Sequence, residues 1–156
     1  MTLLKQIMKV IKIFIITLTF FLSFSISSYA NQSVEEIIKG RKAIFSKNYK
    51  TAKAVSISIK ANDLDKAKGY LKEMSVNYKT LLEYFPEDSK EGFKTEALPI
   101  IWENKKEFLT LMEKASNDVL ILASKLESNS PDFKTLQKEL MWNNCSACHK
   151  KFRAPH

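Results

Sequence analysis

Near the C-terminus, two cysteines and a histidine fall within five consecutive residues, Cys145-Ser146-Ala147-Cys148-His149, and the 156-residue chain has no other cysteine. Two thiols three residues apart can each add across a vinyl group, and the imidazole beside the second can bind a metal ion. On a helix, positions 145, 148 and 149 share one face. This spacing is that of the Cys-x-x-Cys-His segment to which haem is covalently attached.

The same cysteines are compatible with other chemistry. A zinc site needs about four ligands, and the only other histidine is His156, so every candidate ligand would lie within twelve residues of sequence. A thioredoxin-like redox pair needs a strand followed by a helix, whereas the pattern around this motif is helical. A structural disulfide is the third alternative. We favour covalent haem attachment and leave these three open.

The N-terminus has the pattern of an export signal. Three lysines precede an apolar run over residues 13–26, and Ser28-Tyr29-Ala30 fits a signal-peptidase site. We predict a signal peptide over 1–30 and a mature periplasmic domain over 31–156. An uncleaved anchor is the alternative, although a membrane span needs about 20 apolar residues and this run is shorter. Export agrees with the attachment of c-type haem, which takes place outside the bacterial cytoplasm.

The charge pattern bears on the class of partner. The net charge is +8, and basic and acidic residues are interspersed throughout the mature part. A nucleic-acid-binding surface is not predicted, because no single basic block is present. We expect a solvated, weakly cationic surface, with membrane contact only through the signal segment.

The mature part has the periodicity of helices, because apolar residues recur at spacings of three and four and glycine is scarce. Four helices are predicted, over Val34–Ile59, Asp63–Tyr84, Pro99–Leu126 and Ser130–Arg153. Ser130 would be the N-cap of the last helix, with Pro131 at its first position. The predicted fold is all-α, an antiparallel four-helix bundle with its cofactor in the core near the C-terminal helix.

Between the second and third helices, Phe85–Leu98 is predicted to be a loop long enough to suggest a function. On the first helix, the residues expected to face the core include one arginine; they are Ile37, Ile38, Arg41, Ile44, Phe45, Ala52 and Val55. A buried arginine needs a partner. Exposure of Arg41 on the flank of the helix is the alternative.

Three stretches resemble the cytochrome c′ family of class II c-type cytochromes. They are Gly40–Phe45; Phe85–Ser89 with Thr95–Trp102 and Phe108; and Cys145–His149 with Arg153. The pentapeptide alone marks any c-type cytochrome, but its position in the last helix is typical of class II. The resemblance covers nearly all of the chain after the signal and implies one covalently bound haem c.

The resemblance assigns roles to individual residues. It implies that Cys145 and Cys148 form the thioether bonds and that His149 is the proximal iron ligand. Arg153, one turn further, matches a basic residue beside the proximal face, although a solvated arginine is also favourable at a helix C-terminus. Arg41 matches the arginine that contacts the haem propionates, and Glu96 a polar neighbour of the haem.

The residue four after that arginine faces the iron in the family, and here it is Phe45. Methionine at this position gives a six-coordinate electron carrier, whereas an apolar side chain leaves the site open. Phenylalanine has no ligating atom, so we expect five-coordinate, high-spin iron. Met74, Met112 and Met141 are expected to fill gaps in the core.

An open ferrous site binds diatomic gases. Dioxygen is held by a hydrogen-bond donor and nitric oxide does not need one, so Phe45 favours nitric oxide. We therefore predict a non-enzymatic protein that binds gas and carries single electrons. The alternatives are a haem enzyme, such as a peroxidase or a nitric oxide reductase component, and a haem-free structural bundle.

The sequence does not define a redox partner protein. The resemblance implies a homodimer, since members of the family often pair through their first two helices. Three residues on these helices, Ile57, Ile59 and Tyr70, would leave apolar area outside the core, which agrees with that expectation.

Overall fold

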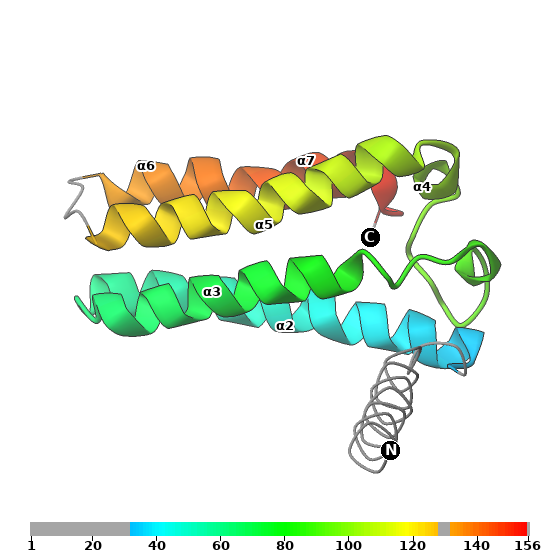
Figure 1. Ribbon diagram of the computed structural model, residues 1–156, viewed down its shortest axis with the longest axis horizontal. Coiled ribbons are helices and arrows are strands. Elements are labelled where there is room, and N and C mark those ends of the chain that lie inside the picture. The colour runs from blue at the N-terminus through cyan, green and yellow to red at the C-terminus, as the bar shows by residue number, and fades with distance from the viewer. Residues whose placement is uncertain (1–31, 128–131, 156) are drawn as a thin grey trace, which may run out of the picture. The chain divides into compact units, whose positions relative to one another are not determined.

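The computed structural model describes residues 32–127 and 132–155, and their long helical segments pack as a bundle (Figure 1). α2 (Val34–Lys60) and α3 (Leu64–Leu81) form one antiparallel pair. α5 (Lys105–Glu127) pairs with a C-terminal segment made of α6 (Phe133–Gln137), a π-helical turn (Lys138–Trp142) and α7 (Asn143–Phe152). The predicted all-α, antiparallel four-helix bundle is confirmed. The predicted signal peptide over 1–30 lies outside the described residues.

Side chains at the helix starts explain where the helices begin. Ser33 caps α2 in a capping box, in which the Ser33 Oγ accepts from the backbone N–H of Glu36 and the Glu36 carboxylate accepts from the backbone N–H of Ser33. Asp63 caps α3 by accepting from the backbone N–H of Lys66. Asp132 caps α6 by accepting from the backbone N–H of Thr135.

The start of the last helix is described only in part, and the predicted third helix is wrong in one respect. The predicted cap Ser130 and first helical residue Pro131 lie outside the described residues; among those described, α6 begins at Phe133 with Asp132 as its N-cap, because the Asp132 side chain accepts from the backbone N–H of Thr135 in the first turn. The predicted third helix is broken: α4 (Ile100–Glu103) ends at Asn104, whose φ of −115° and ψ of 44° are not helical. α5 then starts in a new direction and runs to Glu127.

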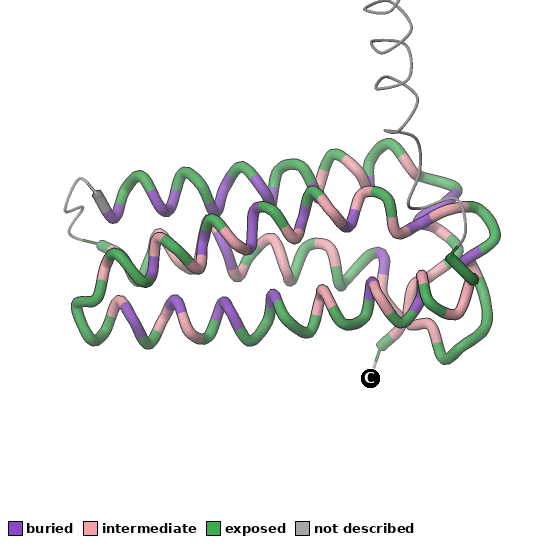
Figure 2. The backbone as a smooth tube through the Cα atoms, turned by 60° about the horizontal axis from the view of Figure 1, so that its bottom comes forward, coloured by how far each residue is buried: buried purple, intermediate pink, exposed green. Residues whose placement is uncertain are grey.

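The core lies along the inward faces of the helices, as the alternation of buried and exposed backbone in Figure 2 shows. From the predicted inward set, Ile38, Arg41, Ala52 and Val55 are buried on α2, and Ile44 and Phe45 pack against the core while partly exposed. Met74, Met112 and Met141 are all buried in the core, as expected of gap-filling side chains. Within the described residues, no helix is both long and apolar enough to span a bilayer.

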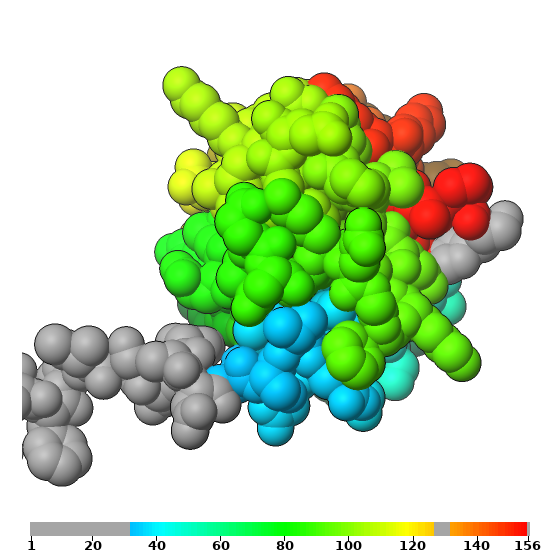
Figure 3. Space-filling model, turned by 90° about the vertical axis from the view of Figure 1, so that its right-hand side faces the viewer, coloured from blue at the N-terminus to red at the C-terminus, as the bar shows by residue number. Residues whose placement is uncertain are grey.

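The segment between α3 and α5 covers one end of the bundle. It contains a 3-10 turn, Glu87–Ser89, and the short helix α4, and in Figure 3 it lies between the start of α2 and the C-terminal residues. The predicted loop over Phe85–Leu98 is therefore present, with a helical turn inside it. Phe93 and Lys94 have φ angles of 47° and 54°, so the chain reverses here through left-handed residues.

Candidate haem-binding site

The five-residue motif lies on α7, as predicted, so its reactive side chains follow helical spacing. Cys145 and Cys148 are half-buried, and His149 is exposed. Both thiols are free, which argues against the structural disulfide. Because residues three and four apart are neighbours on a helix, one planar ligand can meet both sulfur atoms and the imidazole.

Burial dominates the electrostatics of the two thiols. It raises the pKa of the Cys148 thiol to about 11, with a smaller contribution from Cys145. The pKa of Cys145 is also raised by burial, and the nearby Tyr78 hydroxyl offsets part of that rise. Reactive redox cysteines have lowered pKa values, so these raised values do not fit a thioredoxin-like redox pair.

Zinc is disfavoured by geometry. Across residues 32–127 and 132–155, no cluster of three or more His, Cys, Asp or Glu side chains could hold a metal ion. His156, the fourth candidate ligand in the sequence, lies outside the described residues.

A π-helical turn directly precedes the motif, and nothing in the sequence predicted it. Its i→i−5 bonding is evident where the backbone N–H of Asn143 donates to the carbonyl of Lys138. The extra residue in the turn sets the rotation of α7 relative to α6. Within the turn, Met141 is buried and the Trp142 ring meets Tyr49 of α2 edge-on, with ring centroids 6.3 Å apart. α2 therefore meets the C-terminal segment at the level of the motif.

Phe45 lies on α2 one turn before this contact. Its ring meets Phe85 edge-on, with centroids 6.5 Å apart, and it is partly buried against the core. Phe85 also meets Phe108 at 4.6 Å, and Phe108 meets Phe152 of α7 at 5.3 Å. Phe45 thus belongs to an aromatic chain that crosses the bundle to α7; that it faces the iron stays a prediction.

Arg41 is buried, with 2% of its surface exposed, so exposure on the helix flank is wrong. Its guanidinium donates four hydrogen bonds: to the Tyr84 carbonyl at 3.3 Å, to Ser89 Oγ and the Ser89 carbonyl at 2.9 Å each, and to Thr95 Oγ1 at 2.6 Å. It also lies 4.8 Å from the centroid of the Phe85 ring. Burial lowers the pKa of Arg41 to about 10, which leaves it charged at neutral pH.

The partners of Arg41 are therefore in the loop after α3. We expected a buried Arg41 to need a partner, and the family resemblance implied haem propionates. In the structure, acceptors of the protein itself bind the guanidinium. Contact with propionates stays a prediction. The neighbouring Lys42 donates to the carbonyl of Lys94 at 2.9 Å, which ties the same loop to α2 from its exposed side.

Glu96 and Arg153 were predicted separately, and the structure brings them together. Arg153 Nε donates to the Glu96 carboxylate at 2.9 Å, with both side chains partly exposed. Around this ion pair, the Leu98 N–H donates to the Phe152 carbonyl at 3.0 Å and the Ala154 N–H to the Glu96 carbonyl at 2.8 Å. The end of the motif helix is thereby fastened to the loop that Arg41 holds.

Two polar residues of the site were missed by the sequence analysis. Tyr78 of α3 is buried and lies near the Cys145 thiol; burial, and after it the nearby thiol, raises the pKa of Tyr78 far above the usual value. The signal in the sequence is its place four residues after Met74, on the same helical face as that expected core residue. A tyrosine buried there needs a partner for its hydroxyl. Asn48 of α2 is also buried, and its Oδ1 accepts from Asn77 Nδ2 at 2.8 Å.

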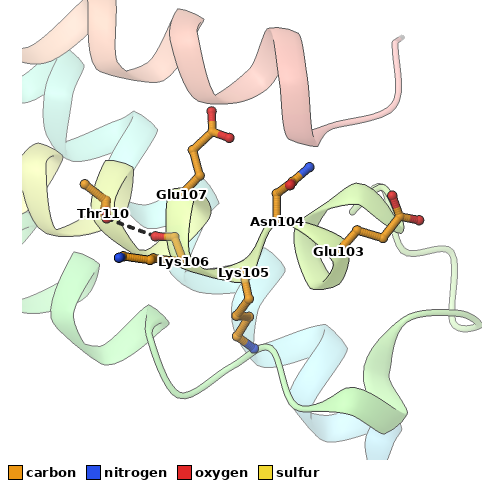
Figure 4. A pocket seen from close by; sticks show the side chains of 6 residues that line it. All are labelled: Glu103, Asn104, Lys105, Lys106, Glu107 and Thr110. Atoms are coloured by element: carbon orange, nitrogen blue, oxygen red, sulfur yellow. Dashed lines mark hydrogen bonds between the residues drawn. The ribbon is translucent and has the colours of Figure 1, made fainter.

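A surface hollow elsewhere does not serve this chemistry. Six side chains from the start of α5 and the end of α4 line it, as Figure 4 shows, and all are polar or charged: Glu103, Asn104, Lys105, Lys106, Glu107 and Thr110. No residue of the motif lines it. A largely apolar porphyrin needs a different surface, which the aromatic chain beside α7 provides.

The donor set fits a covalently attached haem. Two free, neutral thiols and one imidazole lie on the same short helix, and the aromatic chain from Phe45 through Phe85 and Phe108 to Phe152 lies beside them. Tyr78 contacts the first thiol from α3. This combination meets the requirements of thioether formation and axial ligation by His149.

The comparisons with known proteins agree with this chemistry. The family model of cytochrome c′ matches residues 36–153. Cytochrome c′ of Rhodopseudomonas palustris is 31% identical over 124 residues, covering 76% of this chain and 82% of that protein. Cytochrome c′ of Rhodospirillum rubrum is 29% identical over 120 residues, covering 75% and 81% respectively. A solved structure of the R. palustris protein superposes with a TM-score of 0.66 at 28% identity, covering 80% of this chain and 98% of that one.

The fold and the site define a helical-bundle haem protein of the c type. The chain belongs to the cytochrome c′ family, since the family model spans most of its length. The resemblance stated from the three sequence stretches is confirmed.

Proposed function

We propose that this chain carries one haem c, bound covalently through Cys145 and Cys148 with His149 as the iron ligand, and that it binds diatomic gases and carries single electrons. The haem would supply reversible gas binding and a one-electron change at its iron. The residues of the chain attach it, enclose it and restrict access to it. One haem per chain follows from the single cysteine pair.

Phe45 carries the proposal of an open, five-coordinate site. It lies on the inward side of α2, its ring packs on Phe85, and the next turn of α2 contacts Trp142 beside the motif. A phenyl ring fills space but offers no lone pair. The core methionines Met74, Met112 and Met141 are enclosed by other core side chains, which supports a packing role for them.

Gas binding by the fold has a precedent. A variant cytochrome c′ from Alcaligenes xylosoxidans, which shares the fold at 15% identity, has been solved in its ferrous form with nitric oxide bound. At that identity the likeness supports the fold alone. For this chain, the proposal of nitric oxide as the preferred ligand depends on Phe45.

The enzyme alternative receives less support. Peroxidase-type chemistry needs an acid–base group on the open side of the iron. The buried polar side chains near Phe45 on α2 are Arg41, whose terminal nitrogens are occupied by loop acceptors, and Asn48, which does not ionise. We therefore propose a binding and electron-carrying role and no catalytic residue.

The absorption spectrum of protein exported to the periplasm tests this function. We expect a high-spin, five-coordinate spectrum that changes on adding nitric oxide, and haem that stays with the chain on acid–acetone extraction. Intact mass should equal that of residues 31–156 plus one haem, which also tests the proposed cleavage after Ala30. Freely extracted haem would contradict covalent attachment, and a low-spin spectrum would contradict the open site.

A homodimer through α2 and α3 is proposed on narrower grounds than the sequence suggested. Of the three residues expected outside the core, Ile57 is 67% exposed, whereas Ile59 and Tyr70 pack partly against the core. Val76 of α3 is a further exposed apolar residue, at 62%. Sedimentation velocity should show a dimer that Ile57→Lys weakens; a monomer at high micromolar concentration would refute it.

A further inference from the structure

One buried amide nitrogen lacks a hydrogen-bond partner. Asn48 is 4% exposed, and its Oδ1 accepts from Asn77 Nδ2 at 2.8 Å. Its own Nδ2 is the only buried side-chain nitrogen or oxygen in the described part of the chain for which no partner is present. A buried donor left unpaired costs free energy, so such an atom calls for an explanation.

The position of Asn48 points to the haem side of the bundle. Arg41, Phe45, Asn48 and Ala52 recur at spacings of three and four, so they share the inward face of α2. Ala52 is 1% exposed and small, which limits what fills the space beside the amide. The adjoining Tyr49 meets Trp142, three residues before the first motif cysteine.

Residues of α3 also place the Asn48 amide beside the cysteine motif. Asn77 fixes the amide of Asn48 from α3, and the next residue, Tyr78, lies near the Cys145 thiol. α2 and α3 therefore each place the amide beside the segment that carries the motif.

Helix packing does not account for this atom. The buried pair Ser75 and Ser116 joins α3 to α5 at 2.8 Å, and Ser116 Oγ also bonds the Ser75 carbonyl at 3.1 Å, so both hydroxyls are satisfied. An apolar side chain of similar size at position 48 would fill the same volume without an unpaired donor. The free N–H group is explained if a ligand outside the polypeptide accepts from it.

We propose that Asn48 donates a hydrogen bond from Nδ2 to a diatomic gas bound on the Phe45 side of the haem. This rests on the function proposed above. Asn77 is a positioning residue, because its bond to Oδ1 directs Nδ2 away from α3. Phe45 limits the size of the site, while Asn48 holds ligands whose outer atom gains negative charge. The site is therefore less apolar than Phe45 alone implies, and the preference for nitric oxide over dioxygen is smaller than that expected from Phe45 alone.

Carbon monoxide on the reduced holoprotein is the probe. A donor to the outer oxygen draws electron density into the C–O antibonding orbital and lowers the C–O stretching frequency. We expect Asn48→Leu to raise that frequency, and Asn48→Val serves if leucine does not fit. Dissociation of nitric oxide should become about two- to tenfold faster, the range that corresponds to losing one hydrogen bond. Ser116→Ala, which removes another buried polar group, should leave both readouts unchanged.

The outcomes separate the two proposals. If the unmodified holoprotein forms no carbon monoxide complex, the open-site function fails. If it forms one and the frequency is the same in Asn48→Leu and Asn48→Val, the role of Asn48 is overturned while the function stands. A lower frequency in these variants overturns it too, since Asn48 would then present Oδ1. An equal shift in Ser116→Ala would reduce the effect to general loosening of the core and overturn the role.

Discussion

Arg41 and Asn48 are two buried polar residues on the same face of α2, two turns apart, but they differ in how fully their hydrogen-bond donors are satisfied. The Arg41 guanidinium donates four hydrogen bonds to Tyr84, Ser89 and Thr95. Asn48 uses its carbonyl oxygen and leaves its nitrogen without a partner. Arg41 lies where the loop after α3 supplies acceptors, whereas Asn48 lies at the level of the cysteine motif.

The difference indicates how burial of a polar group should be interpreted in this bundle. A charged side chain whose donors are satisfied by its own chain fastens the structure, and its loss should be felt in stability. A buried polar group whose donor is not satisfied lowers the stability of the protein without ligand, and it gains a hydrogen-bond partner only when a ligand binds. On the inward face of α2, Arg41 thus stabilises the fold, whereas Asn48 is proposed to contact the ligand.

The largest stability effect is expected at Arg41. Arg41→Leu leaves the Ser89 and Tyr84 carbonyls and two hydroxyls without their donor, so we expect a loss of about 3 kcal/mol in the free energy of unfolding of the holoprotein. Urea unfolding measures it. Lys42→Leu is the matched control, because Lys42 makes one exposed bond to the same loop, and should cost under about 0.5 kcal/mol. Equal losses in the two variants would show that the buried hydrogen bonds of Arg41 contribute no more stability than the exposed bond of Lys42.

Phe45 lies between Arg41 and Asn48, and its removal should affect both stability and ligand access. Because the ring is partly exposed, Phe45→Ala should cost about 2–3 kcal/mol, below the range for a fully buried phenylalanine. Carbon monoxide should associate faster. Phe45→Met should convert the high-spin spectrum to a low-spin one through thioether ligation. Unchanged spectra and association rates in both variants would show that Phe45 does not face the haem.

Tyr78 tests how much a buried polar group on α3 contributes to stability. Tyr78→Phe keeps the buried ring and removes a buried hydroxyl near Cys145, so we expect a loss of about 1 kcal/mol in the free energy of unfolding, measured in urea. Tyr49→Phe is the control, because that side chain is 55% exposed, and should be near neutral. A larger loss at Tyr49 than at Tyr78 would contradict the placement of the hydroxyl beside the motif.

The smallest effect is expected at the Glu96–Arg153 pair. Its side chains are 43% and 31% exposed, so Glu96→Gln should cost at most about 1 kcal/mol, and less at high salt. The backbone bonds from Leu98 and Ala154 would still hold the loop to α7. Unfolding at low and high ionic strength measures the charge contribution. Glu107→Gln, which removes the exposed partner of Lys151, is the control; a salt-independent loss at Glu96 would point to packing instead.

Local sequence determined the helices and the attachment motif. The helical period placed Ile38, Ala52 and Val55 inside, and Asp63 marked the start of α3 because its side chain caps the first turn. The Cys-x-x-Cys-His spacing indicated covalent haem attachment without information from the rest of the chain. Each of these features depends on residues within a few positions of one another.

Tertiary structure decided what the polar residues contact. Arg41 bonds Ser89 and Thr95, 48 and 54 positions away, and Glu96 meets Arg153 across 57 positions. The break at Asn104 and the π-helical turn before the motif likewise have no signal in the local pattern. The physical reason is that helical propensity and capping act within a turn, whereas the partner of a buried donor is fixed only when separate helices pack. The unpaired Nδ2 of Asn48 is therefore visible only in the folded bundle.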